Sequence, residues 1–159
     1  MKLIVSIPQQ TLSLIKENQV VKSYSVSTAL AGVGNEKNSG QTPLGKHKIR
    51  AKIGGDLPKN SVLVGRRPTG EIYNEDLAQT YPNRDWVLTR ILWLSGLEKG
   101  INRLGNQDTM QRYIYIHGTP DSEPMGIPKS HGCIRMRNED VIALFDSVPL
   151  GCEVEIINA

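Results

Sequence analysis

Short apolar runs, several of them alternating with polar residues, recur along this chain and predict a protein built mainly of β-strands. The expected strands cover residues 2–7, 11–15, 20–27, 46–52 and 61–64 in the first half, and 113–117, 135–137 and 152–157 in the second. A turn at Glu17 and Asn18 is expected to join the second and third strands into a hairpin.

The longest apolar run, Trp86–Leu94, is rich in β-branched and aromatic residues, which favours a central strand. Periodicity alone leaves a buried helix open as the alternative for this run. We expect its two tryptophans in the core, or one of them at the rim of a cleft.

Two short helices are expected among the strands. The first is predicted at Asn74–Gln79, where a capping asparagine precedes two acidic residues. The second is expected to be capped by Asn138–Asp140. Its apolar residues fall on one helical face and are Val141, Ile142, Leu144, Phe145 and Val148. The predicted fold is therefore a β-rich single domain over residues 1–159, mainly β with two short helices.

Composition narrows the class of protein. The chain has 159 residues, enough for one domain with a hydrophobic core that needs no disulfide bonds. Hydrophobic residues make up 38% of the chain, charged residues 22%, and the formal net charge is +3. This mild basic excess suits a small acidic substrate but is too weak to indicate a nucleic-acid partner. No apolar run is long enough for a transmembrane helix, so a membrane partner is not expected, and the oligomeric state is left open.

The N-terminus bears on location. Met1–Pro8 is too short and too soon interrupted to be the apolar part of a secretory signal, so it predicts a first strand instead. A chain that begins this directly in its domain is expected in the cytoplasm. The periplasm or the cell wall is expected instead if Met1 stands where an export segment or anchor was.

The richest stretch chemically is Tyr113–Asn138. It holds two of the three histidines and one of the two cysteines, in a setting dense in Gly and Pro. Its alternating start predicts a strand that ends at His117, where Gly118 and the residues after it begin a loop. A cysteine becomes a nucleophile when an imidazole takes its proton and nearby cations lower its pKa. Cys133, with two imidazoles and several cations in the same stretch, therefore indicates acyl transfer through a thioester.

This stretch resembles a known signature. His117, an intervening loop, then Ser130-His131-Gly132-Cys133 and a hydrophobic residue are similar to the motif of the L,D-transpeptidase catalytic domain, also called the YkuD domain. Thr42–Ile49 resembles that family's Thr-Pro-x-Gly segment, although the chain has Arg135 where many members carry Asn. The resemblance implies a β-sandwich-like domain with the catalytic cysteine in a cleft at the sheet edge.

Roles follow as hypotheses. Cys133 is the expected nucleophile and His117 the base that deprotonates it and later protonates the leaving amine. The resemblance implies that the Gly118 carbonyl orients His117. Backbone N–H groups around Gly132 and Cys133 are expected to form the oxyanion hole.

The other residues of the motif are assigned to substrate binding. Arg135 is a candidate fork for a substrate carboxylate, because guanidinium binds carboxylate in a bidentate way. His131 either lines the substrate site or supports its loop. Ser130 is expected to make local hydrogen bonds beside Gly132.

Two other functions stay open at this stage. His117, His131 and Cys133 are three candidate zinc ligands in a non-catalytic domain, but a structural zinc normally takes a fourth ligand and none lies near in sequence. A binding module for cell-wall fragments would leave a base and a nucleophile without purpose. We therefore expect an enzyme that needs no metal or cofactor.

The resemblance also implies the substrate. Family members act on peptidoglycan stem peptides, attack the L-centre of the third residue, usually diaminopimelate, and release the terminal D-alanine. Since dilute amines in the cytoplasm compete poorly with water, we expect mainly an L,D-carboxypeptidase that trims tetrapeptides to tripeptides during recycling. Transpeptidation, by cross-linking or D-amino-acid exchange, is the alternative.

Several residues outside the motif are expected to be structural. Cys152 is read as a buried, unpaired residue rather than a disulfide partner of Cys133, and His47 as a structural or exposed histidine. The basic pair Arg66 and Arg67 is expected in a solvated loop, with a substrate role as the alternative. The loop at residues 96–107 is a candidate lid.

Overall fold

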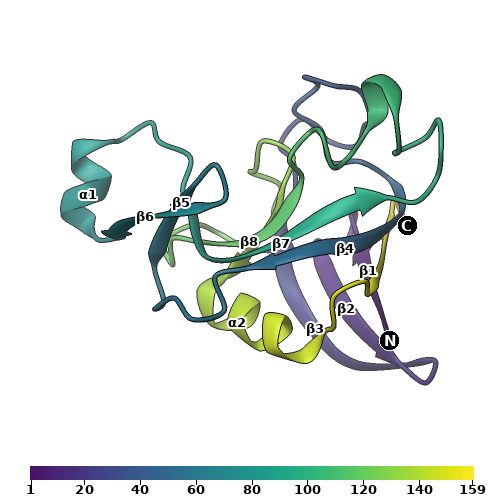
Figure 1. The fold of residues 1–159 in the computed structure, drawn as a ribbon, viewed down its shortest axis with the longest axis horizontal. Helices are drawn as coiled ribbons and strands as arrows, with labels where there is room; N and C mark the ends of the chain where they lie inside the picture. The colour runs from purple at the N-terminus through teal and green to yellow at the C-terminus, as the bar shows by residue number, and fades with distance from the viewer.

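One strongly curved sheet of ten strands makes up most of the protein, which we describe over residues 1–159 from a computed structural model (Figure 1). The strands are β1 (Lys2–Ser6), β2 (Thr11–Lys16), β3 (Gln19–Ser27), β4 (Gly45–Ile53), β5 (Ser61–Val64), β6 (Arg67–Ile72), β7 (Val87–Gly96), β8 (Tyr115–Thr119), β9 (Ile134–Arg137) and β10 (Glu153–Ile157). Two α-helices, α1 (Glu75–Thr80) and α2 (Asn138–Ser147), and a 3-10 turn at Gly105–Gln107 complete the fold. The β-rich prediction with two short helices is confirmed. Neither helix is long and apolar enough to cross a membrane.

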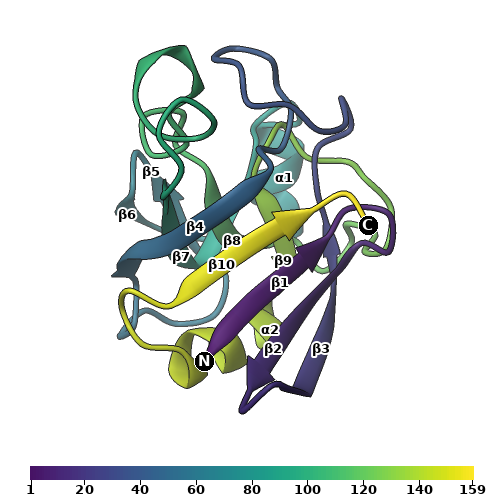
Figure 2. The same cartoon turned by 90° about the vertical axis from the view of Figure 1, so that its right-hand side faces the viewer.

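The sheet closes on itself. Its strand order is β4-β10-β1-β2-β3-β9-β8-β7-β5-β6, and β4 also pairs with β7. The first and last strands of the chain, β1 and β10, lie side by side in parallel, as Figure 2 shows. The β5–β6 hairpin branches from the start of β7 and reaches away from the closed part together with α1 (Figure 1).

The core fills the inside of this curved sheet. Inward-facing residues of β1, β2, β3, β7 and β10 join α2, which lies across one end of the sheet (Figure 1). Four apolar residues of the predicted helical face are buried, namely Val141, Leu144, Phe145 and Val148. Burial of each such side chain stabilises the fold by roughly 1.5–3 kcal/mol. Because α2 follows β9 directly, this packing fixes the strand that Cys133 precedes.

Two local predictions were wrong. The strand expected to end at His117 starts at Tyr115 and continues to Thr119, because Gly118 stays in the ladder opposite Leu88 and Met136. The region around Arg66 and Arg67 is not an open loop but the tip of the β5–β6 hairpin, in which Val64 pairs with Arg67.

The loop proposed as a lid is fastened to its neighbour. The buried Asn102 donates to the carbonyls of Leu44 and Lys46, at 3.1 and 3.0 Å. Asn106 accepts a backbone hydrogen bond from Lys37. This loop therefore packs on the residues before β4, whereas the hairpin tip is the segment that reaches the side chains beside Cys133.

Candidate active site

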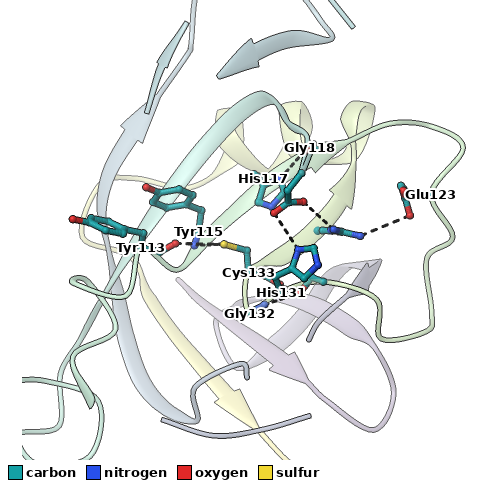
Figure 3. A network of polar contacts seen from close by, with 11 residues as sticks. Tyr113, Tyr115, His117, Gly118, Glu123, His131, Gly132 and Cys133 are labelled. Carbon is teal, nitrogen blue, oxygen red and sulfur yellow. Dashed lines mark hydrogen bonds and ion pairs between the residues drawn. The ribbon is translucent and has the colours of Figure 1, made fainter. Parts of the chain in front are cut away.

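Cys133 lies where two parallel strands begin. β8 and β9 pair in parallel, with Ile116 opposite Ile134 and His117 opposite Arg135, so the residue before β9 falls beside the start of β8. The Tyr115 N–H donates to Cys133 Sγ at 3.3 Å, and the thiol faces the Tyr113 carbonyl at 3.4 Å (Figure 3). The sheet thus places Cys133 beside the start of the strand that carries His117, although the sequence separates the two residues by a long loop.

A bend before β8 shapes this contact. Tyr113 adopts a φ of 56°, which is uncommon for a residue with a side chain. The bend turns the Tyr113 carbonyl and the Tyr115 N–H toward the same sulfur. It also explains why the strand starts two residues later than its alternating pattern predicts.

The resting thiol is protonated. Burial raises the pKa of Cys133 to about 11, and the negative charge of Asp85 acts in the same direction. The Tyr115 N–H and the positive charges of Arg135 and Arg112 favour the thiolate but do not outweigh burial. The expectation that nearby cations lower the pKa below its usual value was therefore wrong, and the nucleophile depends on a base for its activation.

His117 has the form of a base. Its side chain is 1% exposed, and Nδ1 lies 2.6 Å from the Gly118 carbonyl oxygen. Since a carbonyl only accepts, the neutral ring carries its proton on Nδ1 and keeps a free lone pair on Nε2. Burial lowers the pKa of His117, with Gly118 and Asp85 opposing this effect. The geometry agrees with the orienting role that the resemblance implies for Gly118.

Gly118 is held from behind by Asn138. A side chain at Gly118 would come within 2.6 Å of the Leu88 carbonyl and would also meet Asn138, so only glycine fits. Asn138 donates to the Thr119 carbonyl at 2.9 Å and accepts from the Thr89 hydroxyl at 2.6 Å. Asn138 was expected to cap α2, yet Arg137 is the cap residue and the asparagine side chain supports the strand of His117.

The turn before Cys133 is fixed by two hydroxyls. Thr42 donates to the Gly132 carbonyl at 2.9 Å, which gives the Thr-Pro-x-Gly segment a structural reason. Ser130 donates to the Cys133 carbonyl at 2.6 Å, the local role expected of it, and accepts from the Gly132 N–H at 3.2 Å. Because Ser130 occupies the Gly132 N–H, the Cys133 N–H is the donor of this pair that remains for an oxyanion. The role of the Gly132 and Cys133 N–H groups as an oxyanion hole stays a prediction, in which Gly132 would have to exchange its bond to Ser130 for one to the oxyanion.

A charged cluster lies on the His117 side of the thiol (Figure 3). Asp85 contacts Arg135 at 3.0 Å and His131 at 3.3 Å, and Arg135 also lies 3.7 Å from Glu123. Burial alone would raise the pKa of Asp85, but the neighbouring side chains of His117 and Arg135 and the hydrogen bond from His131 hold it below its usual value. These residues line a cavity of about 270 Å³.

The substrate roles of Arg135 and His131 stay predictions. The Arg135 side chain is 9% exposed and is already ion-paired, so a substrate carboxylate would have to share or replace Glu123. The His131 side chain is 74% exposed, which suits a residue that lines the cleft. Asp85 was not identified from sequence, since an acid between an arginine and a tryptophan carries no motif.

An aromatic cluster lies on the other side of the thiol. Trp93 and Tyr115 meet edge to face with ring centres 6.1 Å apart, and Tyr113 lies 6.3 Å from Trp93. Trp93 is partly buried and packs beside Tyr115, whereas Trp86 packs against Val62 and Leu88 and also lines the cavity of the charged cluster. Arg112, in the segment before β8, supports this side by donating to the carbonyl of Gln41 in the loop before β4, at 2.6 Å.

Other candidates lie apart from this chemistry. The largest cavity, about 620 Å³ beside α1, is lined by no histidine or cysteine. His47 is buried between Thr109 and Gly45, a structural position. Cys152 is buried and unpaired, as expected. The structure brings together no group of three or more His, Cys, Asp or Glu side chains suited to a metal ion.

The fold and this site define a β-rich domain that carries a candidate nucleophile, Cys133, and a candidate base, His117, where the parallel strands β8 and β9 meet. The sequence model of the L,D-transpeptidase catalytic domain, YkuD, matches residues 1–156, so the chain belongs to that family.

Individual relatives agree. The chain is 28% identical over 145 residues to YqjB of Bacillus subtilis, a candidate L,D-transpeptidase by name, covering 91% of this chain and 64% of the relative. It is 47% identical over 47 residues to YbiS of Escherichia coli, also a candidate by name, covering 30% of this chain and 15% of the relative. L,D-transpeptidase 3 from Mycobacterium tuberculosis, solved with a faropenem-derived adduct, shares the fold with a TM-score of 0.54, 17% identity and coverage of 97% of this chain and 58% of that one. The chain thus spans less than two thirds of each of these relatives.

Proposed function

We propose that this protein is a cysteine enzyme that cleaves peptidoglycan stem peptides at the L-centre of the residue before the terminal D-amino acid. The observation that carries the proposal is a partly exposed thiol at the start of β9 next to the strand of a buried histidine whose Nδ1 is held by the Gly118 carbonyl. Membership of the L,D-transpeptidase family supports the substrate class.

The first half-reaction uses both residues. His117 Nε2 takes the proton of Cys133 as Sγ attacks the carbonyl carbon, and the Cys133 N–H donates to the oxygen that becomes negative. The C–N bond then breaks, and His117 returns the proton to the leaving amine, which leaves a thioester on Sγ. No hydrogen bond links the ring and the thiol at rest, where Sγ faces Tyr113, so a rotation of the Cys133 side chain precedes proton transfer.

For the second half-reaction we propose water as the main acceptor. His117 removes a proton from water as its oxygen attacks the thioester, and the thiol recovers that proton as the acid is released. Support comes from the acids beside the site. Both oxygens of Asp85 are engaged by His131 and Arg135, and Glu123 faces Arg135. No free carboxylate in this cluster remains to hold the ammonium group of an amine acceptor. An L,D-carboxypeptidase is therefore favoured over cross-linking.

The nucleophile is tested by Cys133→Ala, which should abolish turnover and leave the far-UV circular dichroism spectrum unchanged. Mass spectrometry of the wild type after incubation with a carbapenem should place an adduct on Cys133. Cys152→Ala is the matched control and should keep both turnover and adduct. An adduct found on Cys152 alone would reject the assignment.

The acceptor is tested by product analysis. Purified protein is incubated with a diaminopimelate-containing tetrapeptide, with and without a second stem peptide or D-methionine, and the products are read by mass. Tripeptide should dominate in every mixture. If cross-linked dimers or D-methionine exchange products dominate, the enzyme is a transpeptidase instead. The cellular location stays a prediction, which fractionation checks.

A further inference from the structure

Arg66 places a positive charge on the aromatic cluster that flanks Cys133. It sits at the tip of the β5–β6 hairpin, where Gly65 and Arg66 both have positive φ, 56° and 66°, as a two-residue hairpin turn requires. This turn carries the arginine from the outer hairpin to the aromatic cluster of Trp93, Tyr113 and Tyr115. A long side chain in a left-handed conformation is uncommon and is here matched by specific contacts.

Three aromatic residues hold this guanidinium. Its central carbon lies 4.6 Å from the centre of the Trp93 ring and 5.0 Å from that of Tyr113. Its Nη1 donates to the Tyr115 hydroxyl at 3.0 Å. Burial raises the pKa of Tyr115, so the phenol is neutral and does not compensate the arginine charge. The guanidinium is thus fixed in position by groups that leave its charge unbalanced.

No carboxylate neutralises Arg66. All ion pairs of the protein with a nitrogen–oxygen distance of 4.0 Å or less are made by other cations. Arg66 therefore has N–H donors available for the carboxylate of a ligand. Two of its aromatic partners also contact the nucleophile through their backbone, the Tyr115 N–H and the Tyr113 carbonyl both facing Cys133 Sγ. A ligand that extends from Sγ along the side chains of these two tyrosines would reach Arg66 at their far end.

The position of Arg66 also indicates which part of the donor peptide it would contact. His117 must reach the leaving amine, and Figure 3 shows Tyr113 and Tyr115 on the opposite side of Cys133 from the cluster around His131. The group near Arg66 is then the part of the donor that stays on the thioester, not the D-amino acid that departs.

We propose that Arg66, held by Trp93, Tyr113 and Tyr115, forms a subsite that binds a carboxylate of the acyl part of the donor peptide and so determines substrate specificity. A guanidinium with a fixed plane binds carboxylate in a bidentate way. This subsite rests on the proposed function, because it takes Cys133 as the point of attachment.

The test compares Arg66→Met with Arg67→Met. Arg67 is the neighbouring exposed arginine of the same hairpin tip, so its variant removes an equal charge without touching the aromatic cluster. Each is assayed on two tetrapeptide donors, one with free carboxylates in its acyl part and one with these amidated, the terminal D-residue being the same. A third variant, Arg66→Lys, keeps the positive charge but loses the planar guanidinium that can donate two hydrogen bonds to one carboxylate.

Arg66→Met should raise KM about tenfold on the free donor, with kcat changed less, and should have no effect on the amidated donor. Arg66→Lys should lie between wild type and Arg66→Met, and Arg67→Met within about twofold of wild type. The proposal is overturned if Arg66→Met has the KM of the wild type on the free donor, or if its KM rises equally on both donors.

A titration calorimetry experiment with the tripeptide product separates this proposal from the proposed function. The product carries the acyl-part carboxylates but no scissile bond. If the wild type turns over neither donor, the proposed function fails. The subsite then stands if Arg66→Met weakens tripeptide binding about tenfold, and is rejected if binding is unchanged.

Discussion

The two sides of Cys133 each present an arginine, and the protein treats the two in opposite ways. Arg135 is almost fully buried and is paired with Asp85 and Glu123. Arg66 is more exposed, rests on aromatic rings and has no acidic partner. Truncating one partner of a buried ion pair leaves the other charge uncompensated, whereas an exposed cation can be removed at little cost to the fold. We infer that Arg135 mainly orders the histidine side and that Arg66 is free to bind a ligand.

The largest effect is expected on the histidine side. His117→Gln should lower kcat/KM by about 10²–10⁴-fold, because the side chain that moves the proton is lost. Cys133 should also react more slowly with iodoacetamide near neutral pH. Cys152→Ala in both backgrounds removes the second thiol from the measurement. A His117→Gln enzyme with unchanged alkylation and turnover would show that another group activates the thiol.

Asp85→Asn tests whether the charged cluster acts as a unit. It removes the acid that joins His131 and Arg135, and we expect kcat/KM to fall about tenfold, a loss limited by the partial exposure of Asp85. Asp146→Asn on the exposed face of α2 is the matched control and should leave kcat/KM unchanged. If Asp85→Asn also leaves kcat/KM unchanged, catalysis does not depend on the ion pairs beside His117.

Arg135→Lys should have a smaller effect, a rise in KM of about threefold with kcat nearly kept, because a point charge replaces a fork that spans two acids. Arg135→Ala should destabilise the protein more, since it removes the shorter of the two ion pairs of Asp85, and thermal denaturation measures this. Should Arg135→Ala leave kcat/KM unchanged, Arg135 binds no substrate carboxylate, and the contrast with Arg66 becomes sharper.

Most strands were predictable because their pattern is local. The hairpin of β2 and β3, the central β7 and the terminal β10 each carry runs that packing reinforces. The β8 boundary was not predictable, because Gly118 stays in the strand only through Asn138 and Leu88, which are distant in sequence. The β5–β6 hairpin was missed since its second strand holds Pro68 and Gly70, which normally argue against a strand.

The candidate nucleophile Cys133 and the candidate base His117 could be named from sequence through their residue types and motif, and their roles stay predictions. Their neighbours were not. Asp85 and Arg66 each meet the site through contacts that span many residues, such as the ion pair between Asp85 and Arg135 and the hydrogen bond from Arg66 to Tyr115. The thiol pKa was misjudged for the same reason, because burial is a property of the fold and outweighed the cations visible in the sequence.

The smallest predicted effect separates the charges that act on the thiol. In the wild type, the rate of Cys133 alkylation should keep rising with pH toward about 11, since burial favours the neutral thiol. Asp85→Asn removes a negative charge that disfavours the thiolate, so the midpoint should move to lower pH, by less than about one unit because Asp85 is partly exposed. Arg135→Lys keeps its positive charge and should leave the midpoint in place. A shift of the midpoint to higher pH in Asp85→Asn would mean that Asp85 acts on the thiol by holding Arg135 in position rather than through its own negative charge. The ion pair between Asp85 and Arg135, and not the carboxylate alone, would then determine the pKa of Cys133.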